Sequence, residues 1–189
     1  MKTTGLLIAA SLVAGAAVAQ TNWSVDKVHS HLGFAVSHMT VSETTGAFDT
    51  FDAKISSKND DFSDAIVELK AEAGSINTGD PNRDKHLKGP DFFDVEKFNA
   101  LTFKSKTFTK VKDKKYKVTG DLTLHGVTRS VTLELTFNGT YNNNDNKTIA
   151  GFKVSGTLKR SDFSIGANIP TAVVGDEVNI LVNAEFVKG

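Results

Sequence analysis

Apolar and polar residues alternate along most of this chain, and that alternation restricts the fold more than any other feature of the sequence. It is least interrupted in residues 32–37, 65–73, 131–137 and 178–186. Because successive side chains of a β-strand point to opposite faces, each of these segments is predicted to be a strand with one apolar face. Weaker patterns bring the number of strands to about eight, and they lie in residues 46–55, 101–110, 116–125 and 149–159.

Polar runs separate the predicted strands. Asp113-Lys114-Lys115 and residues 142–146 are predicted to be hairpin loops, because Asn, Asp and charged residues tolerate turn geometry. An antiparallel sheet of this size either closes on itself or packs against a second sheet, since open strand edges invite aggregation. The chain contains no Cys, so packing and backbone hydrogen bonds alone must hold the fold. The sequence therefore predicts an all-β domain, and its periodicity leaves barrel and sandwich both open.

One segment breaks the β pattern. Asp80 has the position of a helix N-cap, Pro81 the first helical position, and Gly89-Pro90 follow the predicted end. These signals predict a helix from Pro81 to Lys88. Residues 91–97 are predicted to form a further helical turn, and the apolar residues Phe92 and Phe93 within it indicate that it packs over something, such as the mouth of a barrel.

The first nineteen residues are predicted to be a signal peptide. They contain one basic residue, Lys2, an apolar run over residues 6–18 and the small-residue cleavage pattern Ala17-Val18-Ala19. The apolar run is too short for a membrane span, which needs about 20 apolar residues. We therefore expect export to the periplasm and a single mature domain of residues 20–189, without a membrane span.

Charge and aromatic composition narrow the function. Without Lys2 the chain has 21 basic and 22 acidic residues, so no positive field favours nucleic acid. Thirteen Phe accompany two Tyr and one Trp, so most rings have no polar group to satisfy and suit a dry core or a dry cavity. Nucleophile elbows, phosphate loops, zinc-protease motifs and Cys nucleophiles are absent, and no catalytic residue is predicted.

The order of several short motifs resembles the YceI-like family over most of the mature chain. The motifs are Trp23-Ser-Val-Asp26, His29-Ser30, Phe34-x-Val36-x-His38, Gly46-x-Phe48, Ser75-Ile-Asn-Thr-Gly79, Arg83-Asp-x-His-Leu87, Asp91-Phe-Phe93, residues 120–128, Gly151-Phe152, Arg160-Ser-Asp-Phe163 and Gly175-Asp-x-Val178. Each is weak alone, and their agreement in order carries the resemblance.

The resemblance implies an eight-stranded antiparallel lipocalin-like barrel with the helical insertion near its mouth. It also implies an apolar tunnel that holds an isoprenoid chain, such as a polyprenyl phosphate or quinone, or another long amphiphile, and no cofactor besides that ligand. Strand parity and motif position predict the tunnel-lining residues, and the alternative for each is an ordinary core position. They are Leu32, Phe34, Val36, His38, Phe48, Val67, Leu69, Phe92, Phe93, Phe103, Leu122 and Leu124.

A polar head group would need donors near the mouth. The candidates are Arg83, Lys85 and His86 on the predicted helix, whose N-terminal amides also favour an anion. The alternative is that Arg83 and Asp84 fix the helix to the barrel rim and that the lysines are merely solvated.

Three other functions remain open at this stage. His29 and His31 point the same way on one predicted strand, but no acidic or Cys ligand stands at a supporting spacing, so no metal site is predicted. A metal-dependent or lipid-modifying enzyme would use His38 or His86 as a base. A barrel with a packed interior would instead present its outer face to a partner protein. The sequence leaves the oligomeric state open, a homodimer included.

Overall fold

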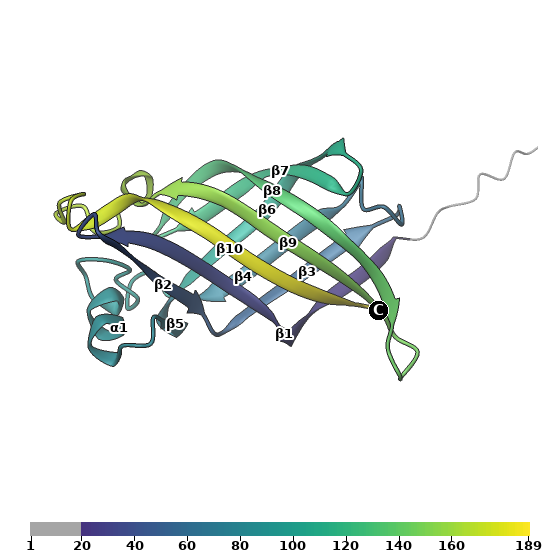
Figure 1. Cartoon of the computed structure of the whole chain (residues 1–189), viewed down its shortest axis with the longest axis horizontal. Coiled ribbons are helices and arrows are strands. Elements are labelled where there is room, and N and C mark those ends of the chain that lie inside the picture. Colours follow the sequence, from purple (N-terminus) through teal and green to yellow (C-terminus); the bar gives the residue numbers. More distant parts are fainter. Residues whose placement is uncertain (1–19) are drawn as a thin grey trace, which may run out of the picture.

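The computed structural model describes residues 20–189 and shows a closed antiparallel β-barrel with one short α-helix (Figure 1). The predicted signal peptide, residues 1–19, lies outside the described part. The strands are β1 (Thr21–His38), β2 (Ser42–Phe48), β3 (Phe51–Ser57), β4 (Ile66–Glu72), β5 (Ile76–Asn77), β6 (Ala100–Lys112), β7 (Lys115–Leu124), β8 (Val127–Asn142), β9 (Thr148–Lys159) and β10 (Val174–Lys188).

The barrel closes because β1 pairs with β10 along most of its length, from Trp23 opposite Lys188 to His38 opposite Val174. The remaining neighbours follow the order β10-β9-β8-β7-β6-β4-β3-β1. This gives the ring of eight strands that the resemblance implied, and it removes the open edges that a flat sheet would expose.

Residues 46–55 were predicted to be one strand, and that prediction is wrong in detail. The chain turns at Asp49-Thr50, so β2 pairs with one half of β1 and β3 with the other half. β4 and the short β5 repeat this division, because β4 pairs with β3 and β5 pairs with β2. A 3₁₀ turn, η1 (Ala73–Ser75), joins β4 to β5.

The predicted helix is confirmed with its bounds. α1 (Pro81–Lys88) begins after Asp80, whose carboxylate accepts hydrogen bonds from the backbone N–H groups of Asn82 and Arg83. Figure 1 shows α1 at the end of the barrel opposite the C-terminus. Residues 91–97 form successive hydrogen-bonded turns and no helix, which corrects the second helical prediction. Pro90 and the left-handed backbone of Asp94, with φ of 42°, interrupt a helical path there.

Both predicted hairpin loops are confirmed, between β6 and β7 and between β8 and β9. A third hairpin turns at His125 and Gly126, whose φ angles of 51° and 73° are those of a tight type I′ turn. The described residues contain no helix with the length and apolarity that crossing a membrane requires.

A second 3₁₀ turn, η2 (Arg160–Phe163), follows β9 and leads into the loop of residues 164–173. Arg160 is buried at 7 % exposure, and its guanidinium donates to the carbonyl oxygens of five residues. These are Ile165, Gly166, Ile169, Val174 and Gly175, at 2.5 to 3.1 Å. The Arg160 guanidinium thus holds this loop in place over the end of the barrel.

Candidate apolar binding site

An apolar cavity lies inside the barrel, with a volume of about 180 Å³. All the side chains on its wall are apolar, and all eight strands of the ring contribute. The lining residues are Val25, Leu32, Gly33, Phe34, Phe48, Phe51, Ala53, Ile55, Val67, Leu69, Leu101, Phe103, Val118, Leu122, Leu124, Val131, Leu133, Leu135, Phe152, Val154, Leu158, Ile180, Val182, Ala184 and Phe186. The volume lies below the roughly 300–1,000 Å³ of drug-sized ligand pockets, which favours a slim chain over a bulky ring system.

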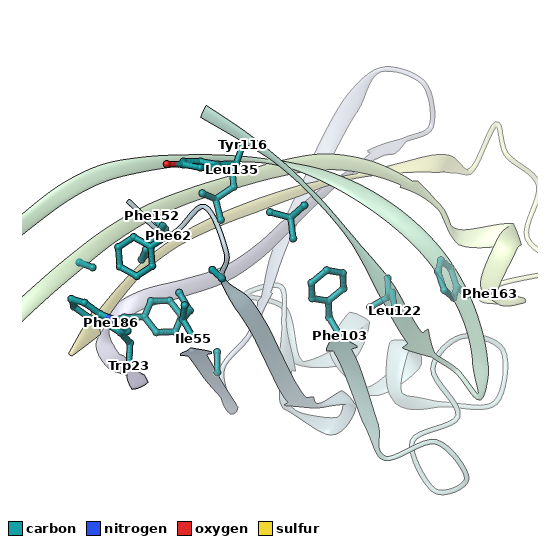
Figure 2. Close-up of a cluster of buried hydrophobic side chains, with 14 of the residues drawn as sticks. Trp23, Ile55, Phe62, Phe103, Tyr116, Leu122, Leu135, Phe152, Phe163 and Phe186 are labelled. Atoms are coloured by element: carbon teal, nitrogen blue, oxygen red, sulfur yellow. The ribbon is translucent and has the colours of Figure 1, made fainter. Parts of the chain in front are cut away.

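Buried aromatic rings close the barrel at the end where the chain termini of the mature domain lie, which we call the closed end. Phe62, 1 % exposed, lies 5.2 Å from the Trp23 ring and 5.0 Å from the Phe152 ring (Figure 2). The Phe137 ring also lies 5.0 Å from that of Phe62. Tyr116 donates a 2.5 Å hydrogen bond to the carbonyl oxygen of Asp61, and burial raises the pKa of the Tyr116 hydroxyl. The loop that carries Phe62 is therefore fixed to the barrel wall.

The opposite end, which we call the capped end, is covered by the turns after α1 and by η2. The Phe93 ring lies edge-on to that of Phe48, with 5.7 Å between centroids. Phe92 and Phe163 are 6 % and 1 % exposed and belong to the same buried cluster. His125 holds η2 in place, because its Nδ1 lies 3.1 Å from the Phe163 carbonyl oxygen. The expectation that residues 91–97 pack over the barrel mouth agrees with this arrangement.

Eight of the twelve residues predicted to line the tunnel line the cavity: Leu32, Phe34, Phe48, Val67, Leu69, Phe103, Leu122 and Leu124. The other four do not form its wall. Val36 is half-buried and His38 is exposed at the far end of β1, while Phe92 and Phe93 belong to the capped end. Val36 and His38 continue the regular pairing of β1 with β2, but they lie near the end of β1, beyond the residues that line the cavity.

Two glycines on the apolar faces pack tightly against aromatic rings. A Cβ on Gly46 would lie 2.6 Å from the Phe34 ring, and a Cβ on Gly120 would lie 2.6 Å from the Phe103 ring. Each glycine thus accommodates an aromatic ring that lines the cavity. The space inside the barrel comes from the size of the ring of strands, a property that residue size at single positions does not report.

None of the three head-group candidates lines the cavity. Arg83 donates from Nε and Nη2 to the hydroxyl and carbonyl oxygens of Thr78, at 2.7 and 2.9 Å. The backbone N–H and the hydroxyl of Thr78 in turn donate to Asp84, at 2.9 and 2.6 Å. Arg83 and Asp84 therefore fix α1 to the end of β5. This agrees with the alternative to a head-group role, in which the two residues fix the helix to the barrel rim.

The other two candidates are exposed on α1. The His86 ring lies edge-on to Phe92, with 5.0 Å between centroids, and its Nε2 lies 3.6 Å from a carboxylate oxygen of Asp91. Lys85 is exposed on the same helix. His38 and His86, the two residues considered as a base, both lie outside the cavity wall.

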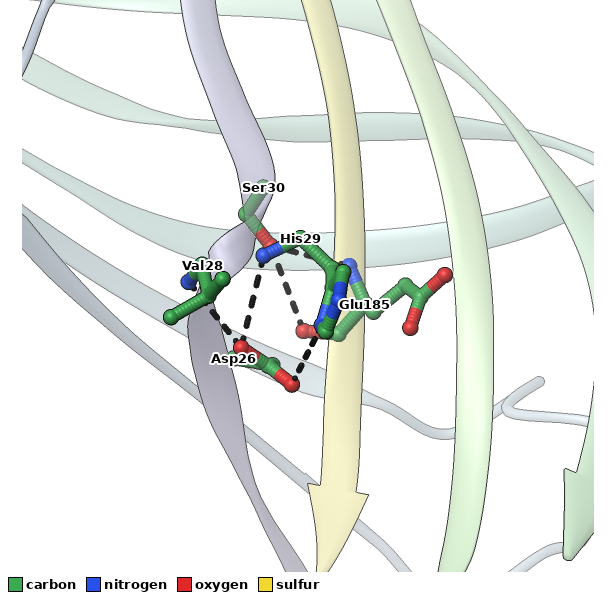
Figure 3. Close-up of polar contacts among 5 residues, drawn as sticks. All are labelled: Asp26, Val28, His29, Ser30 and Glu185. Atoms are coloured by element: carbon green, nitrogen blue, oxygen red, sulfur yellow. Dashed lines mark hydrogen bonds and ion pairs between the residues drawn. The ribbon is translucent and has the colours of Figure 1, made fainter. Parts of the chain in front are cut away.

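A polar cluster forms on the outer face of the barrel where β1 bulges between Asp26 and His31 (Figure 3). His29 Nδ1 lies 2.9 Å from Asp26 Oδ2, and the backbone N–H groups of Val28 and His29 donate to Asp26 Oδ1. The hydrogen bond between the two side chains lowers the pKa of Asp26 and raises that of His29.

Glu185 of β10 completes this cluster, and one ligand atom from each of Asp26, His29 and Glu185 lies within 4.8 Å of the others. The expectation that His29 has no acidic partner at a supporting spacing is wrong, because Asp26 and Glu185 both lie beside it. Its predicted companion, His31, does not belong to the cluster. One imidazole and two carboxylates are donors that a metal such as zinc accepts. The hydrogen bonds of Asp26 and His29 account for their arrangement without one.

Comparison with known proteins agrees with this geometry. The family model of the YceI-like domain matches residues 23–186. A UPF0312 protein of Staphylococcus aureus (strain N315) is 36% identical over 171 residues, which cover 88% of this chain and 97% of that protein.

Two solved structures share the fold. BcnA of Burkholderia cenocepacia aligns with a TM-score of 0.77 and 26% identity, over 85% of this chain and 98% of that one. A domain from Saccharophagus degradans, described as polyisoprenoid-binding, aligns with a TM-score of 0.68 over 88% of this chain and 98% of its own. At 20% identity, the second likeness is one of fold alone.

Proposed function

The chain belongs to the YceI-like family, and we propose that it binds and carries or stores a long isoprenoid lipid, of the polyprenyl phosphate or quinone type, or a similar amphiphile. One observation carries the proposal: the barrel encloses a cavity whose entire wall is apolar. The isoprenoid class comes from the family resemblance.

The energetics suit a slim apolar chain. Each methylene moved from water into such a cavity contributes about 0.8 kcal/mol, so a long hydrocarbon needs few specific contacts to be held. The wall offers no acid, base or nucleophile to a ligand inside the cavity. We therefore propose binding without catalysis.

The location we propose is the periplasm, reached through cleavage of the signal peptide. The composition of residues 1–19 supports this proposal. Intact-mass measurement of the exported protein should give a chain that begins at Gln20, and the chain should appear in the periplasmic fraction. An uncleaved chain in the cytoplasmic fraction would overturn this part of the proposal.

Native mass spectrometry of the gently purified protein tests the binding function. We expect a co-purified lipid, or uptake of added farnesol by the lipid-free protein. A cavity-filling variant, Leu122→Trp, should bind farnesol at least about tenfold more weakly, because the added ring occupies the space of the chain. The matched control is Lys117→Trp, which adds the same ring to the exposed face of the same strand.

The outcomes separate the alternatives. Binding by wild type and Lys117→Trp but not by Leu122→Trp supports a ligand inside the barrel. A wild-type protein that carries no lipid and takes up none contradicts the proposal, and equal binding by both variants places the ligand elsewhere. Circular dichroism should first establish that Leu122→Trp folds, since overpacking costs about 1–3 kcal/mol.

A further inference from the structure

The ladder between β8 and β9 stops well before either strand ends. Its last pair is Glu134 with Ser155. Beyond it β8 runs on to Val127 and β9 to Lys159, and each stays paired on its other side, with β7 and β10 respectively. Within residues 20–189, no ladder pairing joins residues 127–133 to residues 156–159. We call this unpaired stretch of the wall the seam.

Two hollows open on the outside of the barrel over the seam, with volumes of about 550 and 440 Å³. Both are lined by Thr132 of β8 and Thr157 of β9, which face each other if the register of the ladder is continued. Ile180 lines the larger hollow and also the inner cavity, while Val131 and Leu158 line the smaller hollow and the cavity. At the seam, a single layer of apolar side chains therefore separates the cavity from the outside.

Leu133 occupies the point at which the ladder ends. A Cβ on Gly156 of β9 would lie 2.6 Å from Leu133 Cδ2, so the Leu133 side chain extends across the seam into the place that a side chain at Gly156 would take. The other limit of the seam is a hydrogen bond from Arg129 Nε to the carbonyl oxygen of Asp162, at 3.2 Å. Between these limits, side-chain rotation can widen the passage without breaking ladder hydrogen bonds.

The rim of the smaller hollow is polar and carries a net positive charge. Arg129 and Lys159 supply two cations and Asp162 one carboxylate, and the Ser130 hydroxyl lies among them. The hydroxyls of Thr132 and Thr157, also on this rim, are hydrogen-bonded to Thr119 and Asn179. Arg129 donates to the Asp162 carbonyl oxygen through Nε alone. Its two terminal nitrogens donate no hydrogen bond to any of the described residues. Two cations beside a serine hydroxyl suit an acidic head group such as a phosphate or a carboxylate.

We propose that the seam is the lateral entrance of the cavity, and that the acidic head group of a bound amphiphile lies in the smaller hollow against Arg129 and Lys159. The inference rests on the proposed binding function. Both ends of the barrel are covered, one by the ring of Phe62 and the other by Phe92, Phe93 and Phe163. The apolar tail passes between Val131 and Leu158 to reach the cavity, and the head stays in water.

Farnesyl phosphate and farnesol test the head-group site, because they share one tail and differ in the acidic head. Calorimetric titration of wild type should show tighter binding of farnesyl phosphate. Arg129→Gln with Lys159→Gln should reduce that preference about tenfold and leave farnesol binding unchanged, since one charge-assisted hydrogen bond contributes that much. Lys115→Gln with Lys117→Gln removes the same charge from the exposed face of β7 and is the matched control.

A cross-link tests the entrance. Thr132→Cys with Thr157→Cys, joined by a short bismaleimide, ties the two strands across the seam, and the natural chain has no cysteine to interfere. Thr136→Cys with Lys153→Cys joins the same strands where they are already paired. Stopped-flow fluorescence of cis-parinaric acid should show association and dissociation slowed about tenfold or more by the first cross-link, and less than about twofold by the second.

The outcomes distinguish this inference from the binding function. Wild type that binds neither farnesol nor farnesyl phosphate contradicts the proposed function itself. Wild type that binds both, but exchanges cis-parinaric acid equally fast with and without the seam cross-link, overturns the entrance. An undiminished preference for farnesyl phosphate in the seam variant overturns the head-group site. A preference lost instead in Arg83→Gln with Lys85→Gln would place the head group at α1.

Discussion

The side chain of Leu133 fills the space directly over Gly156, so that a Cβ on the glycine would lie 2.6 Å from Leu133 Cδ2. The two residues lie on β8 and β9, one position beyond the last ladder pair. A methyl group at Gly156 therefore forces Leu133 to move, and Gly156→Ala should destabilise the protein by about 1–3 kcal/mol.

A double-mutant cycle in urea tests this relationship. Leu133→Ala removes the side chain that the new methyl group would strike, so Gly156→Ala should cost much less in that background, with a coupling of about 0.5–3 kcal/mol. Additive effects would show that the two side chains do not compete for one space.

Phe62 should be the largest single contributor to the closed end. Phe62→Ala removes a ring that lies 5.0 to 5.2 Å from those of Trp23, Phe137 and Phe152, and it should cost about 3–5 kcal/mol in the free energy of unfolding. Val111→Ala, a truncation at a position 58 % exposed, is the control and should change stability by less than about 0.5 kcal/mol. Urea denaturation measures both, and a small effect of Phe62→Ala would contradict the packing described for this end.

Arg160 should hold the loop of residues 164–173 in place. Arg160→Met keeps the length of the side chain but removes the donors for five carbonyl oxygens, so it should cost at least about 3 kcal/mol. Arg160→Lys should recover only part of that, because an ammonium has three donors and lacks the planar fork of a guanidinium.

Limited proteolysis supplies the local measurement for Arg160. Cleavage within residues 164–173 should become faster in Arg160→Met than in wild type, while Lys147→Met at an exposed hairpin position should leave it unchanged. Equal cleavage rates in all three proteins would show that the loop is held by something other than the guanidinium.

Alternation made the barrel wall predictable wherever the ladder is regular. Phe103 and Leu122 were both assigned to the inner face from parity alone, and they are direct partners in the ladder between β6 and β7. Parity along β1 is interrupted by the bulge between Asp26 and His31, so that Val25 and Leu32, an odd and an even position, both line the cavity. A bulge adds residues to one strand without altering composition, so period counting cannot detect it.

The features that depend on distant contacts could not be predicted. Glu185 lies beside His29 although 156 residues separate them in sequence, and Arg160 is satisfied by carbonyl groups, which carry no sequence signal. The seam could not be predicted for the same reason, because the position at which β8 and β9 stop pairing depends on the geometry of the whole ring of strands. The sequence did indicate apolar inner faces, but whether such faces meet or enclose space depends on the diameter of the closed sheet.

The Asp26–His29 pair on the bulge of β1 should make stability depend on pH. Their hydrogen bond raises the pKa of His29 above its usual 6.5 and lowers that of Asp26 below its usual 3.8. Because folding raises the pKa of His29, its protonation stabilises the folded state. This contribution is complete below the pKa of the unfolded chain and is lost as the pH rises through the pKa of the folded protein. A lowered Asp pKa stabilises above 3.8, and that contribution disappears as the pH falls through the folded pKa.

Both stabilising contributions are present between pH 3.8 and pH 6.5. The difference in the free energy of unfolding between wild type and His29→Asn should therefore be largest near pH 5 and should shrink toward pH 8. Urea denaturation at these two pH values measures it, with Val28→Ala as the control, because Val28 lies exposed on the same bulge and has no titratable group. An NMR titration of the His29 ring should give a midpoint above 6.5 in wild type and a lower one in Asp26→Asn. An unchanged midpoint would show that the contact in Figure 3 does not form in solution, because a hydrogen bond to the charged imidazole must raise its proton affinity.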